Sequence, residues 1–386
     1  MTLRESSRLA KINPFRVMSV SQRARVLEAQ GREIIHLEIG EPDFATALPI
    51  IAAAHSALEQ GHTQYSNASG IMPLKEAIAA HYENRYGVQI STERIFVTPG
   101  ASGGLNLLAN MLIEVGDEIL MGDPAYPCNR NLVRLMGGSP CLVPVGPEVN
   151  FQPTVPLLKS QLSANTSGVW LASPANPTGA TLDRKSLTEL SAWASDEQLN
   201  LVADEIYQGI QYSDDVPSAL EVDSTNFVVN SFSKYFGMTG WRIGWLVVPD
   251  DYAEMANVLA QNLYISASSI SQYAALAAFL PETMDIFEQR RDEFENRRNF
   301  LLPALKDLGF ELPTKPDGAF YLYANVSRFS DDCEQFCHRL LEENGIAITP
   351  GTDFGLHNAR HYVRFAFTTS LENIKIAVDR LSSALA

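Results

Sequence analysis

The chain has 386 residues, of which 46% are hydrophobic, and its 29 Lys plus Arg residues against 45 Asp plus Glu residues give a formal net charge of −16. This composition is typical of a soluble globular protein of about two or three domains, and it excludes a collagen-like or disordered chain. The excess negative charge repels nucleic acid and anionic lipid, so neither is expected as a main partner.

Cysteine usage and the first residues favour a cytoplasmic setting. The first 15 residues carry charges but no continuous apolar stretch, which predicts no secretory signal. The uncharged run 255–281 is interrupted by Asn, Gln and Ser side chains and predicts packed helices rather than a membrane span. Four cysteines are too few for a disulfide framework and lack zinc-finger spacing: Cys128, Cys141, Cys333 and Cys337.

Short β-rich runs alternate with helix-length segments from about residue 94 to 248. Such alternation predicts an α/β fold with a mainly parallel seven-stranded sheet that helices cover on both faces. From about residue 282 the pattern changes to a long charged helix followed by shorter elements, which predicts a smaller α+β domain. In that helix, Glu293 and Arg297 are expected to lie on a solvated face without a function. The predicted strands are 94–98, 118–122, 140–145, 169–173, 201–205, 227–231 and 243–248.

Polar or aromatic residues follow five of these predicted strands. Ligands of open parallel sheets bind outside the carboxyl ends of the strands, so these residues are expected to gather at one edge. Each has an ordinary explanation on its own, such as a tight turn, a helix cap, a core aromatic or a surface lysine. The candidates in chain order are Gly100, Ala101, Ser102, Tyr126, Asn176, Asp204, Tyr207, Ser231, Ser233, Lys234 and, eight residues later, Arg242.

Together these side chains match the chemical needs of pyridoxal 5′-phosphate (PLP). Lys234, at the end of a buried strand, would form the Schiff base with the cofactor aldehyde. Asp204 would pair with the pyridinium nitrogen, and Tyr207 and Asn176 would hydrogen-bond the 3′-oxygen. Tyr126 would stack on the ring. The phosphate would be held by the 100–102 turn with Ser231, Ser233 and Arg242.

At this point the sequence resembles the class I/II aminotransferases, the aspartate-aminotransferase-like group of fold-type I PLP enzymes. The matching motifs run along nearly the whole chain, and the lysine segment with its downstream arginine is the most specific. The resemblance implies a large domain at 46–285 and a small domain built from both termini, 1–45 and 286–386. The motifs are Ile-Asn-Pro-Phe (12–15), Gly-Glu-Pro-Asp-Phe (40–44), Tyr-Ser-Asn-Ala-Ser-Gly (65–70), Thr-Pro-Gly-Ala-Ser (98–102), Asp-Pro-Ala-Tyr-Pro (123–127), Asn-Pro-Thr-Gly (176–179), Asp-Glu-Ile-Tyr (204–207), Ser-Phe-Ser-Lys-Tyr-Phe-Gly-Met-Thr-Gly-Trp-Arg-Ile-Gly (231–244) and Arg-Phe-Ala-Phe (364–367).

The resemblance also implies a substrate site and a partner. Arg364 would bind the substrate α-carboxylate, aided by Asn176 and the Gly40 backbone. Without the resemblance, the simpler interpretation of Arg364 is a surface salt bridge. Tyr65 would reach the phosphate of the neighbouring subunit's cofactor, so a homodimer with shared sites is expected. The implied reaction is a ping-pong transfer between an amino acid and a 2-oxo acid, with Lys234 moving the proton and the small domain closing over the site.

This sequence lacks two basic residues with which branches of the family bind a second carboxylate on the substrate side chain. Residues 243–289 contain neither Arg nor Lys, and Ser102 stands where one branch of the family has Lys. We therefore expect a neutral amino acid, apolar, aromatic or methionine-like, with glutamate and 2-oxoglutarate as a possible second pair.

Three alternatives use the same residues differently. A carbon–sulfur β-lyase or another fold-type I PLP enzyme would keep Lys234 and the cofactor. A non-catalytic sensor would keep only the fold, and the acidic charge disfavours the DNA contact of such proteins. A nicotinamide dehydrogenase is disfavoured because residues 100–104 depart from the GxGxxG pattern.

His357 and His361 have helical spacing but no convincing third ligand, so no metal site is predicted.

Overall fold

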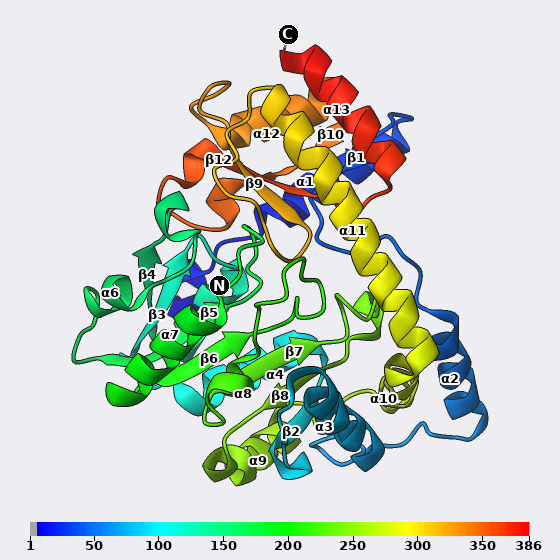
Figure 1. Cartoon of the computed structure of the whole chain (residues 1–386), viewed down its shortest axis with the longest axis vertical. Helices are drawn as coiled ribbons and strands as arrows, with labels where there is room; N and C mark the ends of the chain where they lie inside the picture. Colours follow the sequence, from blue (N-terminus) through cyan, green and yellow to red (C-terminus); the bar gives the residue numbers. More distant parts are fainter. Residues whose placement is uncertain (1–5, 386) are drawn as a thin grey trace, which may run out of the picture.

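The computed structural model describes residues 6–385, and within them its centre is a seven-stranded sheet of order β2-β8-β7-β6-β5-β3-β4 (Figure 1). Strand β8 runs antiparallel to both neighbours, and the other adjacent strands are parallel. This confirms the predicted mainly parallel sheet. Its strands are β2 (Ile95–Thr98), β3 (Glu118–Asp123), β4 (Ser139–Pro144), β5 (Thr166–Ala172), β6 (Asn200–Asp204), β7 (Phe227–Ser231) and β8 (Gly244–Val247).

Helices cover both faces of this sheet because its strands are apolar on both sides. In β2, Val97 packs with the cluster that includes helices α3 and α7, whereas its neighbour Phe96 packs with α4 and α9 on the other face. Alternating side chains thus belong to two different cores. The helices are α1 (Arg16–Ala29), α2 (Leu48–Glu59), α3 (Met72–Tyr86), α4 (Gly100–Leu112), α5 (Pro127–Met136), α6 (Val155–Lys159), α7 (Arg184–Asp196), α8 (Ala219–Val222), α9 (Ala253–Leu263), α10 (Ser269–Leu276), α11 (Pro281–Asp307), α12 (Cys333–Asn344) and α13 (Leu371–Leu385).

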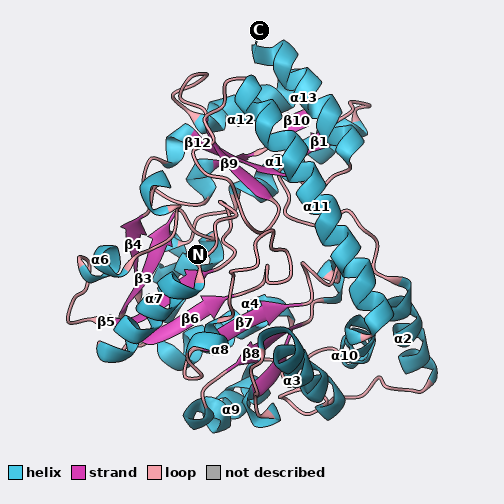
Figure 2. Cartoon of the chain, viewed as in Figure 1, coloured by secondary structure: helices cyan, strands magenta, loops and turns pink. Residues whose placement is uncertain are grey.

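A second, smaller layer lies beside the large sheet. It contains the three-stranded antiparallel sheet β11 (Thr349–Pro350), β12 (Tyr362–Ala366) and β9 (Tyr321–Asn325), and the parallel pair β1 (Ile35–His36) and β10 (Ile346–Ala347). The long helix α11 runs from beside α2 and α10 to this layer, where α12 and α13 pack (Figure 2). The small domain expected from the resemblance would also take in residues 1–5 and 386, which lie outside the described residues.

Local signals explain where several of these elements begin and end. Asp183 caps α7 by accepting a hydrogen bond from the Ser186 N–H at 2.7 Å. Helix α5 begins with Pro127, whose missing N–H costs nothing at a first helical position, and ends at Gly137 with φ 90°. Because α5 begins directly after Tyr126, these signals fix the direction of the chain beside the site.

One expectation for α11 is wrong. Arg297 does not lie on a solvated face, since it is only 3% exposed. Its guanidinium bonds Glu293 at 2.9 Å and Asp43 at 2.8 Å, and it lies 5.0 Å from the ring centroid of Phe44. The i,i+4 pair is therefore half of a buried contact that ties the 43–44 segment to α11, a long-range partner that helical spacing alone does not reveal.

The uncharged run 255–281 forms parts of α9 and α10 and a short 3-10 turn, and its buried alanines pack in the two cores, as predicted. Within residues 6–385, none of the helices is long and apolar enough to span a membrane. The same residues contain no cluster of three or more potential metal-ligating side chains. Cys333 and Cys337 are buried in the core.

Candidate active site

Lys234 lies three residues beyond β7, at the edge where the parallel strands end. Its Nζ donates a hydrogen bond to the Gly40 carbonyl oxygen at 2.6 Å. Burial lowers the pKa of Lys234 to about 8. The positive charges of Arg364 and Arg242 contribute to this lower pKa, and the negative charge of Glu41 opposes it. A large fraction of the amine is therefore neutral, and nucleophilic, near pH 8.

Asp204 and Tyr207 follow the neighbouring strand β6. Asp204 is 4% exposed, and burial raises the pKa of its carboxyl to about 6, although the Ile206 N–H, the Asn129 amide and Lys234 all favour the carboxylate. The Tyr207 hydroxyl lies 2.7 Å from the hydroxyl of Tyr321. Lys234 Nζ is 6.0 Å from the centre of the Tyr207 ring. A carboxyl, a phenol and an amine thus share one buried region.

Arg364 lies in the middle of β12 and is 3% exposed, so it is not part of a surface salt bridge. Its Nη1 donates to Asn176 Oδ1 at 2.7 Å, and its Nη2 donates to the Glu38 carbonyl oxygen. Its Nε is buried without a hydrogen-bond partner in residues 6–385. An unpartnered buried guanidinium N–H needs an acceptor, which a carboxylate would supply.

A second group of residues forms a cradle next to Lys234. Arg242 Nη1 lies 3.4 Å from Ser233 Oγ, and Ser231 Oγ accepts a hydrogen bond from the Ser233 N–H at 3.0 Å. A Cβ atom on Gly100, which has φ +68°, would lie 2.6 Å from Arg242 Nη2. Gly100 therefore lets the N-terminus of α4, with Ala101 and Ser102 in its first turn, approach the guanidinium.

Arg242 itself has the left-handed backbone conformation, with φ 52°. This conformation is costly for a residue with a long side chain and persists where the surrounding structure imposes it, often at functional sites. A helix N-terminus, a guanidinium and two serines meeting in one place form a suitable anion cradle.

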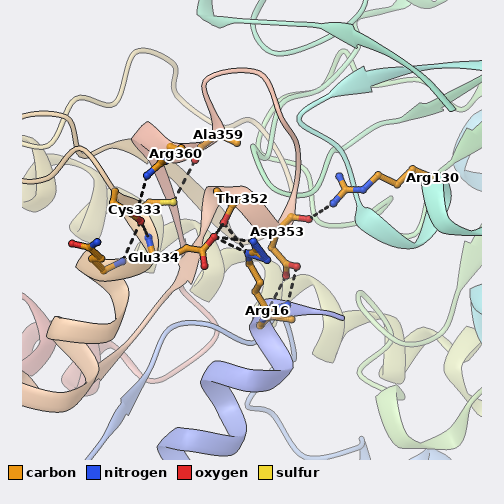
Figure 3. A network of polar contacts seen from close by, with 11 residues as sticks. Arg16, Arg130, Cys333, Glu334, Thr352, Asp353, Ala359 and Arg360 are labelled. Carbon is orange, nitrogen blue, oxygen red and sulfur yellow. Dashed lines mark hydrogen bonds and ion pairs between the residues drawn. The ribbon is translucent and has the colours of Figure 1, made fainter. Parts of the chain in front are cut away.

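Tyr126 lies between the cluster and the segment before α1. Its ring centroid is 6.0 Å from that of Phe15, and burial, with contributions from Cys128 and Asp204, raises the pKa of its hydroxyl. The segment that carries Phe15 is fixed by Asp353, whose carboxylate accepts from the Arg16 N–H at 2.9 Å and the Val17 N–H at 3.2 Å (Figure 3).

Contacts across this region also join the two layers of the molecule. Arg130 of α5 donates a hydrogen bond to the Asp353 carbonyl oxygen at 2.6 Å (Figure 3). The Asp123 carboxylate at the end of β3 accepts from the backbone N–H groups of Leu356 and His357 at 3.0–3.1 Å. The segment with Phe15 is thus attached to the large sheet through the 353–357 loop.

Tyr65 does not join these contacts in the single chain. Its side chain is 81% exposed, and it lies on the surface before α3. The remaining residues expected from the sequence lie at the carboxyl edge of the large sheet or in the small layer facing it.

Four residues that the structure places in the cluster were not predicted from the sequence: Tyr321, Thr349, Phe354 and Asn129. Tyr321 begins β9, but only the fold shows that its hydroxyl meets Tyr207 and that its ring lies against Arg364. Thr349 accepts from Arg364 at 3.4 Å, and Phe354 lies 4.7 Å from its guanidinium. Asn129, in the first turn of α5, has no sequence signal that separates it from an ordinary helix residue.

Known proteins resemble this chain along its whole length. Residues 32–381 match the family model "Aminotransferase class I and II". The chain is 38% identical to a (5-formylfuran-3-yl)methyl phosphate transaminase of Methanocaldococcus jannaschii, with 98% of this chain and 99% of the relative covered. It is 36% identical to a valine–pyruvate aminotransferase of Mycobacterium tuberculosis, with 97% of each chain covered.

A solved structure gives the same result for the fold. The aspartate aminotransferase of Thermus thermophilus with maleate superposes with a TM-score of 0.94 at 32% identity, covering 99% of this chain and 100% of the other. The family model and the similarity over nearly full length agree with the site geometry. The chain belongs to the class I and II aminotransferases, enzymes that depend on pyridoxal 5′-phosphate.

Proposed function

We propose that this aminotransferase acts on a neutral L-amino acid, apolar, aromatic or methionine-like, and that Lys234 is its catalytic amine. The observation that carries the assignment of the site is the position of Lys234. Its partly buried amine is bonded to a neutral carbonyl and lies in the same cluster as Arg364, whose Nε lacks a partner among residues 6–385. An amine nucleophile and a guanidinium that can bind a carboxylate thus lie in the same cluster.

The residues at the sheet edge fit the cofactor. The cradle of Arg242, Ser231, Ser233 and the first turn of α4 supplies the cationic and N–H donors that a phosphate dianion requires. Tyr126 offers a ring face, and Asp204 a buried carboxylate for a protonated ring nitrogen. Tyr207 and Asn176 would donate to the 3′-oxygen. When bound, PLP supplies an aldehyde that accepts the amino group and a ring that withdraws electrons.

Each of these side chains has a defined task in the transfer. Lys234, with its pKa lowered to about 8, would accept the proton from the substrate Cα and would donate a proton again to complete the transfer of the amino group. Asp204 would hold the proton on the ring nitrogen of bound PLP, and the burial of Asp204 would strengthen that interaction. Arg364 orients the α-carboxylate, with Asn176 fixing the guanidinium.

The preference for a neutral substrate rests on residues that are missing. Residues 243–289 offer no Arg or Lys for a distal carboxylate, and the residue at position 102 is Ser. The relatives described above carry names with unlike substrates, so their names do not decide the question. Without a cation at these positions, a distal carboxylate would lack the partner that balances its loss of solvent, which disfavours aspartate.

We further propose a homodimer in which Tyr65 completes the partner's site. Tyr65 is 81% exposed, and Leu48 at the start of α2 and Met72 at the start of α3 are exposed as well, which suits a surface that a second copy would cover.

The substrate proposal is tested with the PLP-loaded enzyme and a panel of amino acids, each with pyruvate or 2-oxoglutarate as acceptor. We expect kcat/KM for at least one neutral amino acid to exceed that for aspartate by roughly tenfold or more, the value of one unpaired carboxylate. A higher kcat/KM for aspartate than for every neutral amino acid contradicts the proposal. Release of 2-oxo acid without any acceptor would instead indicate the β-lyase reaction.

A further inference from the structure

Tyr321 contacts three parts of the site at once. It begins β9 and is 1% exposed. Its hydroxyl lies 2.7 Å from that of Tyr207, and its ring centroid lies 4.3 Å from the Arg364 guanidinium carbon. A Cβ atom on Gly40 would lie 1.8 Å from the Tyr321 hydroxyl, so the phenol also rests against the residue whose carbonyl accepts from Lys234.

We propose that Tyr321 is a positioning residue whose hydroxyl strengthens the hydrogen bond of Tyr207 to the cofactor and whose ring orients Arg364 for the substrate carboxylate. The inference rests on the proposed function, because it takes Tyr207 and Arg364 in the roles given above. Tyr321 contacts both Tyr207 and Arg364. Neither the sequence motifs nor the residues at the strand ends indicated Tyr321.

The direction of the phenol–phenol hydrogen bond follows from the number of protons available. Each hydroxyl has one proton to donate. If Tyr207 gives its proton to the 3′-oxygen of the cofactor, then Tyr321 must be the donor to Tyr207. A hydroxyl that accepts a hydrogen bond becomes a stronger donor, because successive hydrogen bonds polarise one another in a buried site.

That polarisation has a measurable consequence. A stronger bond from Tyr207 stabilises the negative 3′-oxygen and so reduces the affinity of the neighbouring Schiff-base nitrogen for its proton. The charged and titratable groups that face Tyr207 are Arg364, Tyr126, Tyr321 and the Lys234 amine, with Asp204 three residues before it. Replacing Tyr321 by Phe leaves all of the others in place.

The ring has a separate effect on Arg364. The guanidinium lies near the rings of Tyr321 and Phe354, at 4.3 and 4.7 Å, while its Nη atoms are bonded to Asn176 and Glu38. The Tyr321 ring and these hydrogen bonds together restrict how the guanidinium plane can rotate. The N–H of the unpartnered Nε therefore points in one direction. Loss of the ring frees that plane without removing the charge.

The test compares three variants of the PLP-loaded protein. Tyr321→Phe removes only the hydroxyl, and Tyr321→Met also removes the ring while filling similar space. Tyr323→Phe is the matched control, because Tyr323 lies two residues later on β9, is equally buried, and packs against Tyr362 at 4.7 Å. The readouts are the pH midpoint of the visible cofactor absorbance, and KM and kcat for the best substrate.

We expect Tyr321→Phe to raise the pH midpoint by roughly half a unit or more, with KM changed less than about threefold. Tyr321→Met should show the same shift and raise KM about tenfold, as expected from loss of a desolvated cation–π contact. Tyr323→Phe should match the wild type in both. If Tyr321→Met does not fold, Tyr321→Phe alone decides the main point.

A midpoint in Tyr321→Phe equal to that of the wild type overturns the inference while leaving the proposed function intact. Equal shifts in Tyr321→Phe and Tyr323→Phe also overturn it, since they indicate a general effect on the strand. A wild type that binds PLP without a Schiff base, or does not bind it, overturns both proposals.

Discussion

Burial moves the pKa values of Lys234 and Asp204 toward each other. The amine falls to about 8 and the carboxyl rises to about 6, because each charged form loses solvent. Neither residue is fully paired with the other, since the Lys234 amine bonds the Gly40 carbonyl instead. Two groups with protons exchangeable near neutral pH therefore lie in one cluster, an arrangement typical of active sites.

Arg364→Lys tests the carboxylate clamp at the residue scale. A lysine keeps the charge but loses the planar fork, and it leaves the Asn176 oxygen and the Glu38 carbonyl short of a donor. We expect KM for the amino acid to rise roughly 10- to 100-fold, the effect of one or two charge-assisted hydrogen bonds. Steady-state kinetics with PLP in excess measures this.

The control is Arg360→Lys, which changes an arginine that is largely exposed and pairs with Asp332 at 2.9 Å. Its KM should stay within about twofold of the wild type, because exposed pairs contribute little. An unchanged KM in Arg364→Lys would remove Arg364 from the substrate site.

At the scale of elements, hydrophobic pattern was enough to predict the large sheet. The predicted runs 118–122 and 227–231 coincide with β3 (Glu118–Asp123) and β7 (Phe227–Ser231), because fully buried strands are continuous apolar runs with clear ends. Residues that follow such strands were predictable for the same reason. Tyr321 and Arg297 were not, since their roles depend on which distant segment packs on their face.

Arg297→Ala tests the buried contact between α11 and the 43–44 segment. Removing the guanidinium leaves Asp43 and Glu293 without their cation and exposes a space beside the Phe44 ring. We expect the free energy of unfolding to fall by about 2–3 kcal/mol, less than for a fully buried pair, because both carboxylates are about a third exposed to solvent. Lys185→Ala, from a pair with both side chains more than 60% exposed, should change it by less than about 0.5 kcal/mol. If urea titrations give the same loss of unfolding free energy for Arg297→Ala and Lys185→Ala, Arg297 behaves as a solvent-exposed residue and the buried contact is contradicted.

His36 on β1 makes the stability of the small layer depend on pH. Hydrogen bonds to Glu38 at 2.8 Å and Glu28 at 3.1 Å raise the pKa of His36 to about 9, although burial opposes them. The folded protein thus holds this proton more tightly than the unfolded chain, whose His pKa is about 6.5. The resulting stability is complete below about pH 6.5 and is lost as the pH rises through 9.

The measurement is the free energy of unfolding in urea at pH 6 and pH 9.5, for the wild type and His36→Gln. The wild type should lose more stability between the two pH values than the variant, and the other titrating groups cancel in this comparison. Identical losses in both proteins would show that His36 does not hold its proton in the folded state.

At the scale of the whole molecule, the net charge of −16 contrasts with the site. Lys234, Arg242 and Arg364 concentrate positive charge where the large sheet meets the small layer. Electrostatic attraction of an anionic cofactor and substrate is therefore local, and the overall field opposes it. The contacts of Asp123 and Arg130 with the 353–357 loop attach the small layer to the large sheet beside this region.

Mixed dimers test whether the active site is shared. Lys234→Ala and Tyr65→Ala variants are purified, mixed, and allowed to exchange subunits. If Tyr65 serves the partner's site, each mixed dimer regains one site with both residues, and activity should rise above that of either variant alone. Light scattering should give twice the mass of one chain. A monomer, or a mixture no more active than the better parent, contradicts the shared site.

The central claim, that Lys234 is the amine of a PLP-dependent aminotransferase, is tested most directly by trapping. The PLP-loaded protein is reduced with borohydride, which makes a Schiff base permanent, and the labelled peptide is identified by mass spectrometry. Label on Lys234, and its loss in Lys234→Ala, is the result we predict. Label on a different lysine, or none on a protein that has taken up PLP, would contradict the account.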